Sequence, residues 1–161
     1  MREFVLRARK APTTPDFALA DIPPQRHLEI VPHCIVNALF CAGRIRSQVA
    51  VHLVFDGPAA PPKTVWFDSD QLGSLAGLDE RSLWLLLQQV LAAGRHLQLG
   101  EQVQPLPGVG VAKAGFESLV RRRGERGGLF YLCPDGEDIR SVDCGPAPCF
   151  VFTDHLAMPR H

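Results

Sequence analysis

The stretch Leu129–His161, LFYLCPDGEDIRSVDCGPAPCFVFTDHLAMPRH, decides the fold. It holds two short apolar runs, Leu129–Cys133 and Cys149–Phe152, and each run breaks abruptly into a polar loop. Short aromatic or β-branched runs flanked by Gly or Pro are typical of buried strands in an α/β sheet. Ligands of such sheets bind at the carboxyl ends of the strands. The loops that follow Leu132 and Phe152 are therefore the first candidates for a binding site.

The rest of the chain alternates strand patterns with helix patterns. An Asp68-Ser69 pair with Gln71 also favours a short capped helix, and Asp79 has the position of an N-cap for the best helix of the chain. Alternation of this kind predicts an α/β fold, and 161 residues suit a single domain spanning 1–161. The predicted strands are Arg2–Ala8, Val49–Phe55, Thr64–Phe67 and Gly108–Ala112, and the predicted helices are Leu28–Ala42, Glu80–Gly94 and Phe116–Arg123.

The charge composition is balanced, with 17 Lys and Arg against 17 Asp and Glu, so net charge does not indicate a nucleic-acid partner. A local basic face attracts RNA even at zero net charge, because charge attraction is screened over about 8–10 Å. An ordinary solvated surface explains either basic cluster equally well. The two clusters are Arg2, Arg7, Arg9 and Lys10 near the start, and Arg121, Arg122, Arg123 and Arg126 later in the chain.

Several classes of protein are disfavoured by the sequence. Five cysteines without C-x-x-C spacing and without a secretory leader argue for reduced cytoplasmic thiols and against a metal site. No apolar run approaches the roughly 20 residues that cross a bilayer. Gly108-Val109-Gly110 lacks the third glycine of a dinucleotide site. A nucleophilic Cys34 beside His33 or His155 is formally available, although a thiol on a buried helix face is the simpler interpretation.

Four segments occur in an order that carries a family resemblance. They are Met1–Ala8, Phe67–Leu72 followed by Asp79–Arg81, the Tyr131-Leu132 turn with Asp135–Arg140, and Phe150–His155. Together they resemble the SPOUT-class tRNA pseudouridine N1-methyltransferase family, in what looks like its bacterial branch. The resemblance implies a SPOUT-like sheet with helices on both faces. That family continues past the Asp-His strand into a segment that completes a trefoil knot, so we expect this chain to lack part of the knot and to bind the methyl donor weakly or not at all.

The resemblance also implies a cofactor, S-adenosylmethionine, and the residues that bind it. Leu132 and Thr153 match positions that line the adenosyl pocket, with Cys133 adjacent. Many relatives have a small residue where this chain has Thr153. Taken without the resemblance, Leu132 is more simply a core leucine.

Methylation of pseudouridine at N1 requires loss of a ring N–H proton. A carboxylate acts as the base, or an arginine stabilises the developing anion. Asp154 and Arg81 are the candidates for these roles. The alternatives are that Asp154 is a hydrogen-bonded strand-end residue and that Arg81 only belongs to a helix start.

We therefore predict an S-adenosylmethionine-dependent RNA methyltransferase that acts on pseudouridine N1, with tRNA as its substrate. The alternative is a noncatalytic RNA-binding or dimerisation remnant of that family. We expect Arg2, Arg7, Arg9 and Lys10 to contact RNA phosphates, and we expect a cytoplasmic homodimer with no membrane partner and no metal. Apolar residues beside the last strand should form the dimer face: Phe150, Phe152, Leu156 and Met158.

Overall fold

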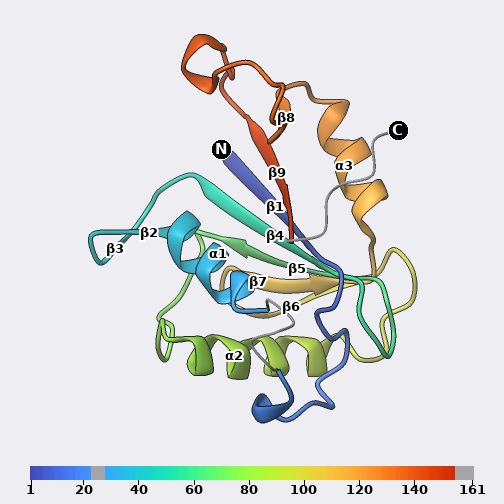
Figure 1. Ribbon diagram of the computed structural model, residues 1–161. Coiled ribbons are helices and arrows are strands. Elements are labelled where there is room, and N and C mark those ends of the chain that lie inside the picture. Colours follow the sequence, from blue (N-terminus) through green and yellow to red (C-terminus); the bar gives the residue numbers. More distant parts are fainter. Residues whose placement is uncertain (23–27, 155–161) are drawn as a thin grey trace.

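The computed structural model describes residues 1–22 and 28–154, and it is built on one sheet of seven strands (Figure 1). The order across the sheet is β6-β7-β5-β4-β1-β9-β8. Strands β4, β1, β9 and β8 are parallel to one another, whereas β5, β7 and β6 are joined by antiparallel pairing. The strands are β1 (Arg2–Ala8), β4 (Val49–Phe55), β5 (Lys63–Asp68), β6 (Gln102–Leu106), β7 (Val109–Ala112), β8 (Leu129–Tyr131) and β9 (Cys149–Thr153).

Helices cover both faces of this sheet, which confirms the predicted α/β fold class. Helices α1 (Ile30–Leu39) and α2 (Glu80–Ala93) pack on one face, where they enclose the larger apolar core. Helix α3 (Phe116–Gly124) packs on the other face through Leu119, against Val5, Val54 and Val151. We call these the α1–α2 face and the α3 face. A small separate hairpin, β2 (Phe40–Cys41) with β3 (Arg44–Ile45), follows α1.

Local sequence signals account for several boundaries. Strand β4 is buried at every position except His52, as expected for a central strand covered on both faces. Helix α2 begins where Asp79 accepts a hydrogen bond from the backbone N of Ser82, 3.2 Å away, so the predicted N-cap is confirmed. Pro32 lies in the first turn of α1, where a missing N–H costs nothing.

Three expectations about individual elements are wrong. Strand β8 is not buried, because it forms the edge of the sheet. Asp68 starts a turn rather than a helix: its carboxylate accepts hydrogen bonds from the Asp70 backbone N and the Gln71 amide. Helix α1 stops at Leu39, short of Ala42, because the chain turns into the β2–β3 hairpin.

Strand β6 was not predicted from the sequence, because Pro105 interrupts it. Proline donates no hydrogen bond to a neighbouring strand, so it is tolerated at a sheet edge. Strand β6 is such an edge, and its register with β7 shifts between Val103 and Leu106. Within residues 1–22 and 28–154, no helix has the length and apolarity to span a membrane.

Candidate functional site

The loop after β8 and the strand β9 enclose a cavity of about 420 Å³. Leu132 and Cys133 line it from the loop, and Phe150 and Phe152 line it from β9. Leu132 is 82% exposed, so the alternative interpretation as a core leucine is wrong. The predicted loop after Leu132 therefore borders a cavity open to solvent.

A row of aromatic rings lies on the α1–α2 face, and three of them line this cavity: Phe130, Phe150 and Phe152. The ring centroids of Phe130 and Phe150 are 5.5 Å apart, and those of Phe150 and Phe4 are 5.7 Å apart. Phe152 extends the row, with its centroid 6.3 Å from Phe4. Alternate residues of a strand point to the same face, so Phe150 and Phe152 lie side by side. Sequence reasoning missed this row as a binding surface, although the spacing of the two residues on β9 was its signal.

A second cavity, of about 370 Å³, lies on the other side of Phe152, between β9 and α1. Thr153 lines this cavity together with His33, Cys34 and Asn37 of α1. Phe152 is common to both cavities. The structure thus places Leu132 and Cys133 in one cavity and Thr153 in the adjoining one, and sequence reasoning did not identify the polar residues His33 and Asn37.

Asp154 is buried behind Thr153 and holds the ends of two strands together. Its Oδ2 accepts a hydrogen bond from the backbone N of Arg9 at 2.8 Å, and its own N donates to the carbonyl of Arg7 at 3.0 Å. The Thr153 hydroxyl lies 3.4 Å from Asp154 Oδ1 and accepts from Arg9 Nη2 at 3.3 Å. The Thr153 hydroxyl therefore lies between a carboxylate and a guanidinium, next to the second cavity.

Arg81 does not lie near Thr153 and Asp154. It lies exposed in the first turn of α2, whereas Lys63 contacts the Gly94 carbonyl at the opposite end of that helix. Lys63 pairs with Phe55 at the carboxyl end of β4. A 14-residue helix is about 20 Å long, so roughly that length separates Arg81 from the strand ends.

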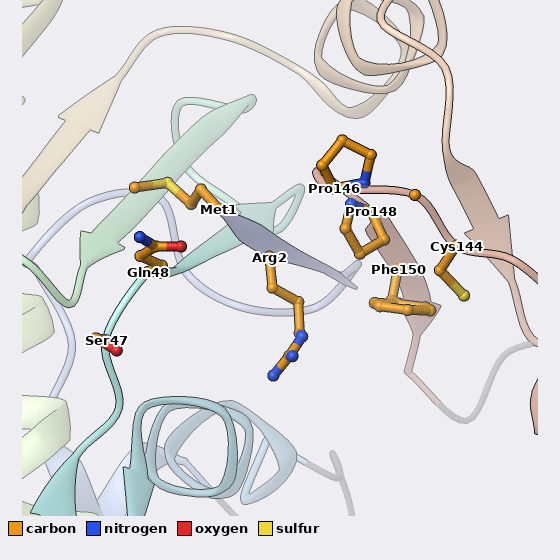
Figure 2. Close-up of a pocket in the computed structure, with 9 residues that line it drawn as sticks. Met1, Arg2, Ser47, Gln48, Cys144, Pro146, Pro148 and Phe150 are labelled. Atoms are coloured by element: carbon orange, nitrogen blue, oxygen red, sulfur yellow. The ribbon is translucent and has the colours of Figure 1, made fainter.

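The N-terminal basic residues are split between the two ends of β1. Arg7, Arg9 and Lys10 lie at its carboxyl end, where Arg7 forms an ion pair with Asp56 at 2.8 Å. Arg2 lies at the opposite end, in a pocket of about 380 Å³ between Gln48 and Phe150 (Figure 2). Of the four residues predicted to contact RNA phosphates, Arg7, Arg9 and Lys10 therefore lie together, whereas Arg2 lies apart from them.

The thiol of Cys34 does not favour nucleophilic chemistry. Burial raises its pKa to about 11, so the neutral thiol dominates near neutral pH. The neighbouring His33 lines the same cavity, whereas His155 lies outside the described residues. All five cysteines are free thiols. In the described part of the chain, no cluster of three or more His, Cys, Asp or Glu side chains is placed to hold a metal ion.

Comparison with known proteins identifies the relationship. A family described as "Putative SAM-dependent RNA methyltransferase" matches residues 1–161. The chain belongs to this family. It is 34% identical over 160 residues to a Vibrio cholerae protein described as "Putative pseudouridine methyltransferase", an alignment that covers 99% of this chain and 80% of the relative. Relatives of the same description from Photobacterium profundum and Alcanivorax borkumensis are also 34% identical, with 99% of this chain and 81% and 80% of the relative covered.

Membership of this family of methyltransferases makes S-adenosylmethionine the cofactor, and the first cavity has suitable chemistry for it. Its aromatic floor suits a purine ring. Glu137 lines the cavity, and the β8–β9 loop also carries Asp135 and Asp143. Negative charge suits the positively charged sulfonium of the donor. The side chains that line the first cavity are therefore suited to binding S-adenosylmethionine.

Proposed function

We propose that this protein methylates N1 of pseudouridine in tRNA, in the cytoplasm, through a single SPOUT-like domain. The observation that carries the proposal is the pair of cavities that share Phe152 at the carboxyl ends of the parallel strands. One cavity holds the methyl donor and the other holds the target base. The description of the relatives supports pseudouridine as the target.

The donor site consists of Leu132, Cys133, Glu137 and the aromatic row. When bound there, S-adenosylmethionine supplies an activated methyl group. Phe130, Phe150 and Leu132, which line this cavity, would hold the apolar part of the donor. The Glu137 carboxylate would attract its positive charge. Holding the two reactants in line supplies much of the rate enhancement in a transfer of this kind.

The base site consists of Thr153, His33 and Asn37, with Asp154 and Arg9 behind Thr153. The amide of Asn37 offers both a donor and an acceptor to the edge of a uracil ring. The Thr153 hydroxyl takes the N1 proton as it gives its own proton to Asp154 Oδ1, 3.4 Å away, so the carboxylate is the final proton acceptor. Arg9 Nη2, 3.3 Å from the same hydroxyl, stabilises the anion that develops on the ring. By its position, Arg9 takes the role that the sequence suggested for Arg81.

The deciding experiment measures methyl transfer from labelled donor to a tRNA transcript that contains pseudouridine, beside the same transcript with uridine. We expect labelling of the first transcript only. Asp154→Asn should lower kcat by about 100-fold or more, while its amide oxygen still accepts from Arg9 N and preserves the fold. Arg81→Gln serves as the control and should retain activity.

The same experiment tests the alternative of a noncatalytic remnant. Calorimetry of donor binding compares Leu132→Asp with Leu99→Asp, because these leucines are 82% and 79% exposed and only Leu132 lines the donor cavity. Weaker donor binding in Leu132→Asp alone supports the proposed site. RNA binding by the wild-type protein without donor binding or methyl transfer would contradict the enzymatic proposal.

A further inference from the structure

A groove of about 340 Å³ lies on the α3 face, away from both cavities described above. Strands β4, β5, β7 and β6 form its floor, and α3 forms one wall. His52 of β4 pairs with Trp66 of β5, which pairs with Gly110 of β7, so these three residues form one row across the sheet. Its charged and titratable lining consists of two arginines and a histidine, and among the described residues no carboxylate lines it.

Trp66 lies flat on the floor of this groove. A Cβ atom at Gly110 would be 2.1 Å from the Trp66 ring, so the absence of a side chain at Gly110 is what lets the indole rest on β7. The indole remains partly exposed. Gln102 and Gln104 of the edge strand β6 are exposed beside it. An aromatic ring flanked by amides is suited to stacking and hydrogen bonding of an unpaired base.

Helix α3 supplies the positive charge of the groove wall. Arg123 donates from Nε to Glu3 Oε2 at 2.5 Å and is thereby fixed and neutralised. Arg122 lines the groove, is exposed, and donates from Nε to the Ser118 carbonyl at 3.3 Å. Arg121 is exposed on the same helix but does not line the groove. Arg122 is thus the cation placed to contact a phosphate next to a base on Trp66.

We propose that this groove is a second RNA-binding site, in which an unpaired nucleotide of the RNA stacks on Trp66 and its phosphate contacts Arg122. The proposal rests on the proposed function, because it takes RNA as the ligand. It deepens that function by extending the bound RNA from the methylation site to the opposite face of the sheet. Binding there positions the RNA and involves none of the residues of the two cavities.

The two tryptophans of the chain allow a direct test by fluorescence. Trp84 is 2% exposed and packs against Phe55 and Phe17. An oligouridylate that contains no pseudouridine, added without donor, should quench the fluorescence of the wild-type protein and of Trp84→Phe. Trp66→Phe should show no quenching, since the remaining Trp84 is buried. Quenching that persists in Trp66→Phe, or equal quenching by inorganic polyphosphate, would overturn the proposal.

A matched pair of variants tests the contact with phosphate. Arg122→Gln should weaken oligouridylate binding by about threefold to tenfold. Because one phosphate contact is lost, the slope of log affinity against log salt concentration should become shallower by about 0.7. Arg121→Gln makes the same charge change one residue away and should stay within about twofold of the wild-type affinity. Equal effects of the two variants would show diffuse attraction in place of a site.

Methyl-transfer kinetics separate this proposal from the proposed function. With the full tRNA, Arg122→Gln should raise KM and leave kcat unchanged. If methyl transfer fails altogether but Trp66-dependent quenching is seen, the groove proposal is supported and the proposed reaction is wrong. If transfer occurs while quenching is absent and KM is unaffected, the groove proposal is wrong.

Discussion

At the scale of single residues, Glu3 has the most strongly perturbed carboxylate in the described chain. Its Oε2 lies 2.8 Å from His52 Nε2 and 2.5 Å from Arg123 Nε. Burial by itself would raise the pKa of Glu3, but the hydrogen bonds and charges of His52 and Arg123 outweigh burial and lower the pKa to about 2. The carboxylate therefore ties β1 to β4 and to α3.

This arrangement predicts a pH-dependent contribution to stability. A carboxylate whose pKa is lower in the folded state than in the unfolded state stabilises the fold above its unfolded pKa, here about 4.5. Glu3→Gln should therefore lower the free energy of unfolding at pH 7 by up to about 3 kcal/mol. The difference should shrink as the pH falls from about 4.5 towards 2. Urea unfolding across this range measures it, and a difference that is constant with pH would contradict the prediction.

Cys34 offers a chemical probe of the second cavity. Because burial raises its pKa to about 11, its thiolate is scarce at pH 8 and alkylation by iodoacetamide should be slow. Its rate should rise about tenfold per pH unit up to about pH 10. Cys41 is exposed and serves as the internal comparison, which should react first. Mass spectrometry of the labelled cysteines reads both rates, and rapid labelling of Cys34 at pH 7 would contradict the prediction.

At the scale of elements, the contact between β5 and β7 depends on Gly110. Gly110→Ala would place a Cβ 2.1 Å from the Trp66 ring and should cost about 1–3 kcal/mol of stability by overpacking. Gly73→Ala is the control, because its Cβ would meet only Pro107 at an ordinary 3.6 Å. Replacing Trp66 by Leu in the Gly110→Ala background should recover part of the loss. Additive losses in the double variant would show that the two residues do not interact.

Elements with a strong local signal were predictable from the sequence, and those that depend on a neighbouring strand were not. Strands β1 and β4 match their predicted bounds, and α2 begins at its predicted cap, because alternation, β-branched runs and capping are local. The edge strands β6 and β8 each pair with only one neighbouring strand. Pro105 made the sequence of β6 unlike a strand, and the apolar composition of β8 did not indicate that this strand is exposed.

The same distinction between local signals and long-range contacts applies to the candidate site. The loops after β8 and β9 were predicted because strand ends are visible in the sequence. The aromatic row and the Glu3–His52–Arg123 contacts were not predicted, because the strand order brings together residues far apart in the chain, such as Phe4 with Phe150 and Glu3 with Arg123. Asp154 and Thr153 were recognised by the family resemblance, but only the structure shows that Arg9, and not Arg81, lies beside them.

At the scale of the whole molecule, the sheet has two halves with different surfaces. The antiparallel half, β5-β7-β6, packs α2 on one face and presents the polar groove on the other. The parallel half ends at β8, where large apolar side chains remain exposed around the cavity that we propose as the donor site: Tyr131 at 66%, Leu132 at 82%, Ile139 at 52% and Phe152 at 36%. A contiguous apolar patch of this kind is typical of a protein–protein interface.

We therefore expect the chain to form a homodimer through the β8–β9 surface, with Phe150 and Phe152 beside the interface. Leu156 and Met158, which the sequence also suggested for this face, lie outside the described residues. Light scattering over a concentration series should give twice the mass of one chain at tens of micromolar.

Leu132→Asp should shift the protein to the monomer, because a carboxylate in an apolar interface loses its hydration without a partner. Leu99→Asp places the same charge on a leucine of similar exposure, 79% against 82%, outside this surface, so it should leave the dimer intact. A monomeric wild-type protein would exclude the dimer, and equal dissociation by both variants would place the interface elsewhere.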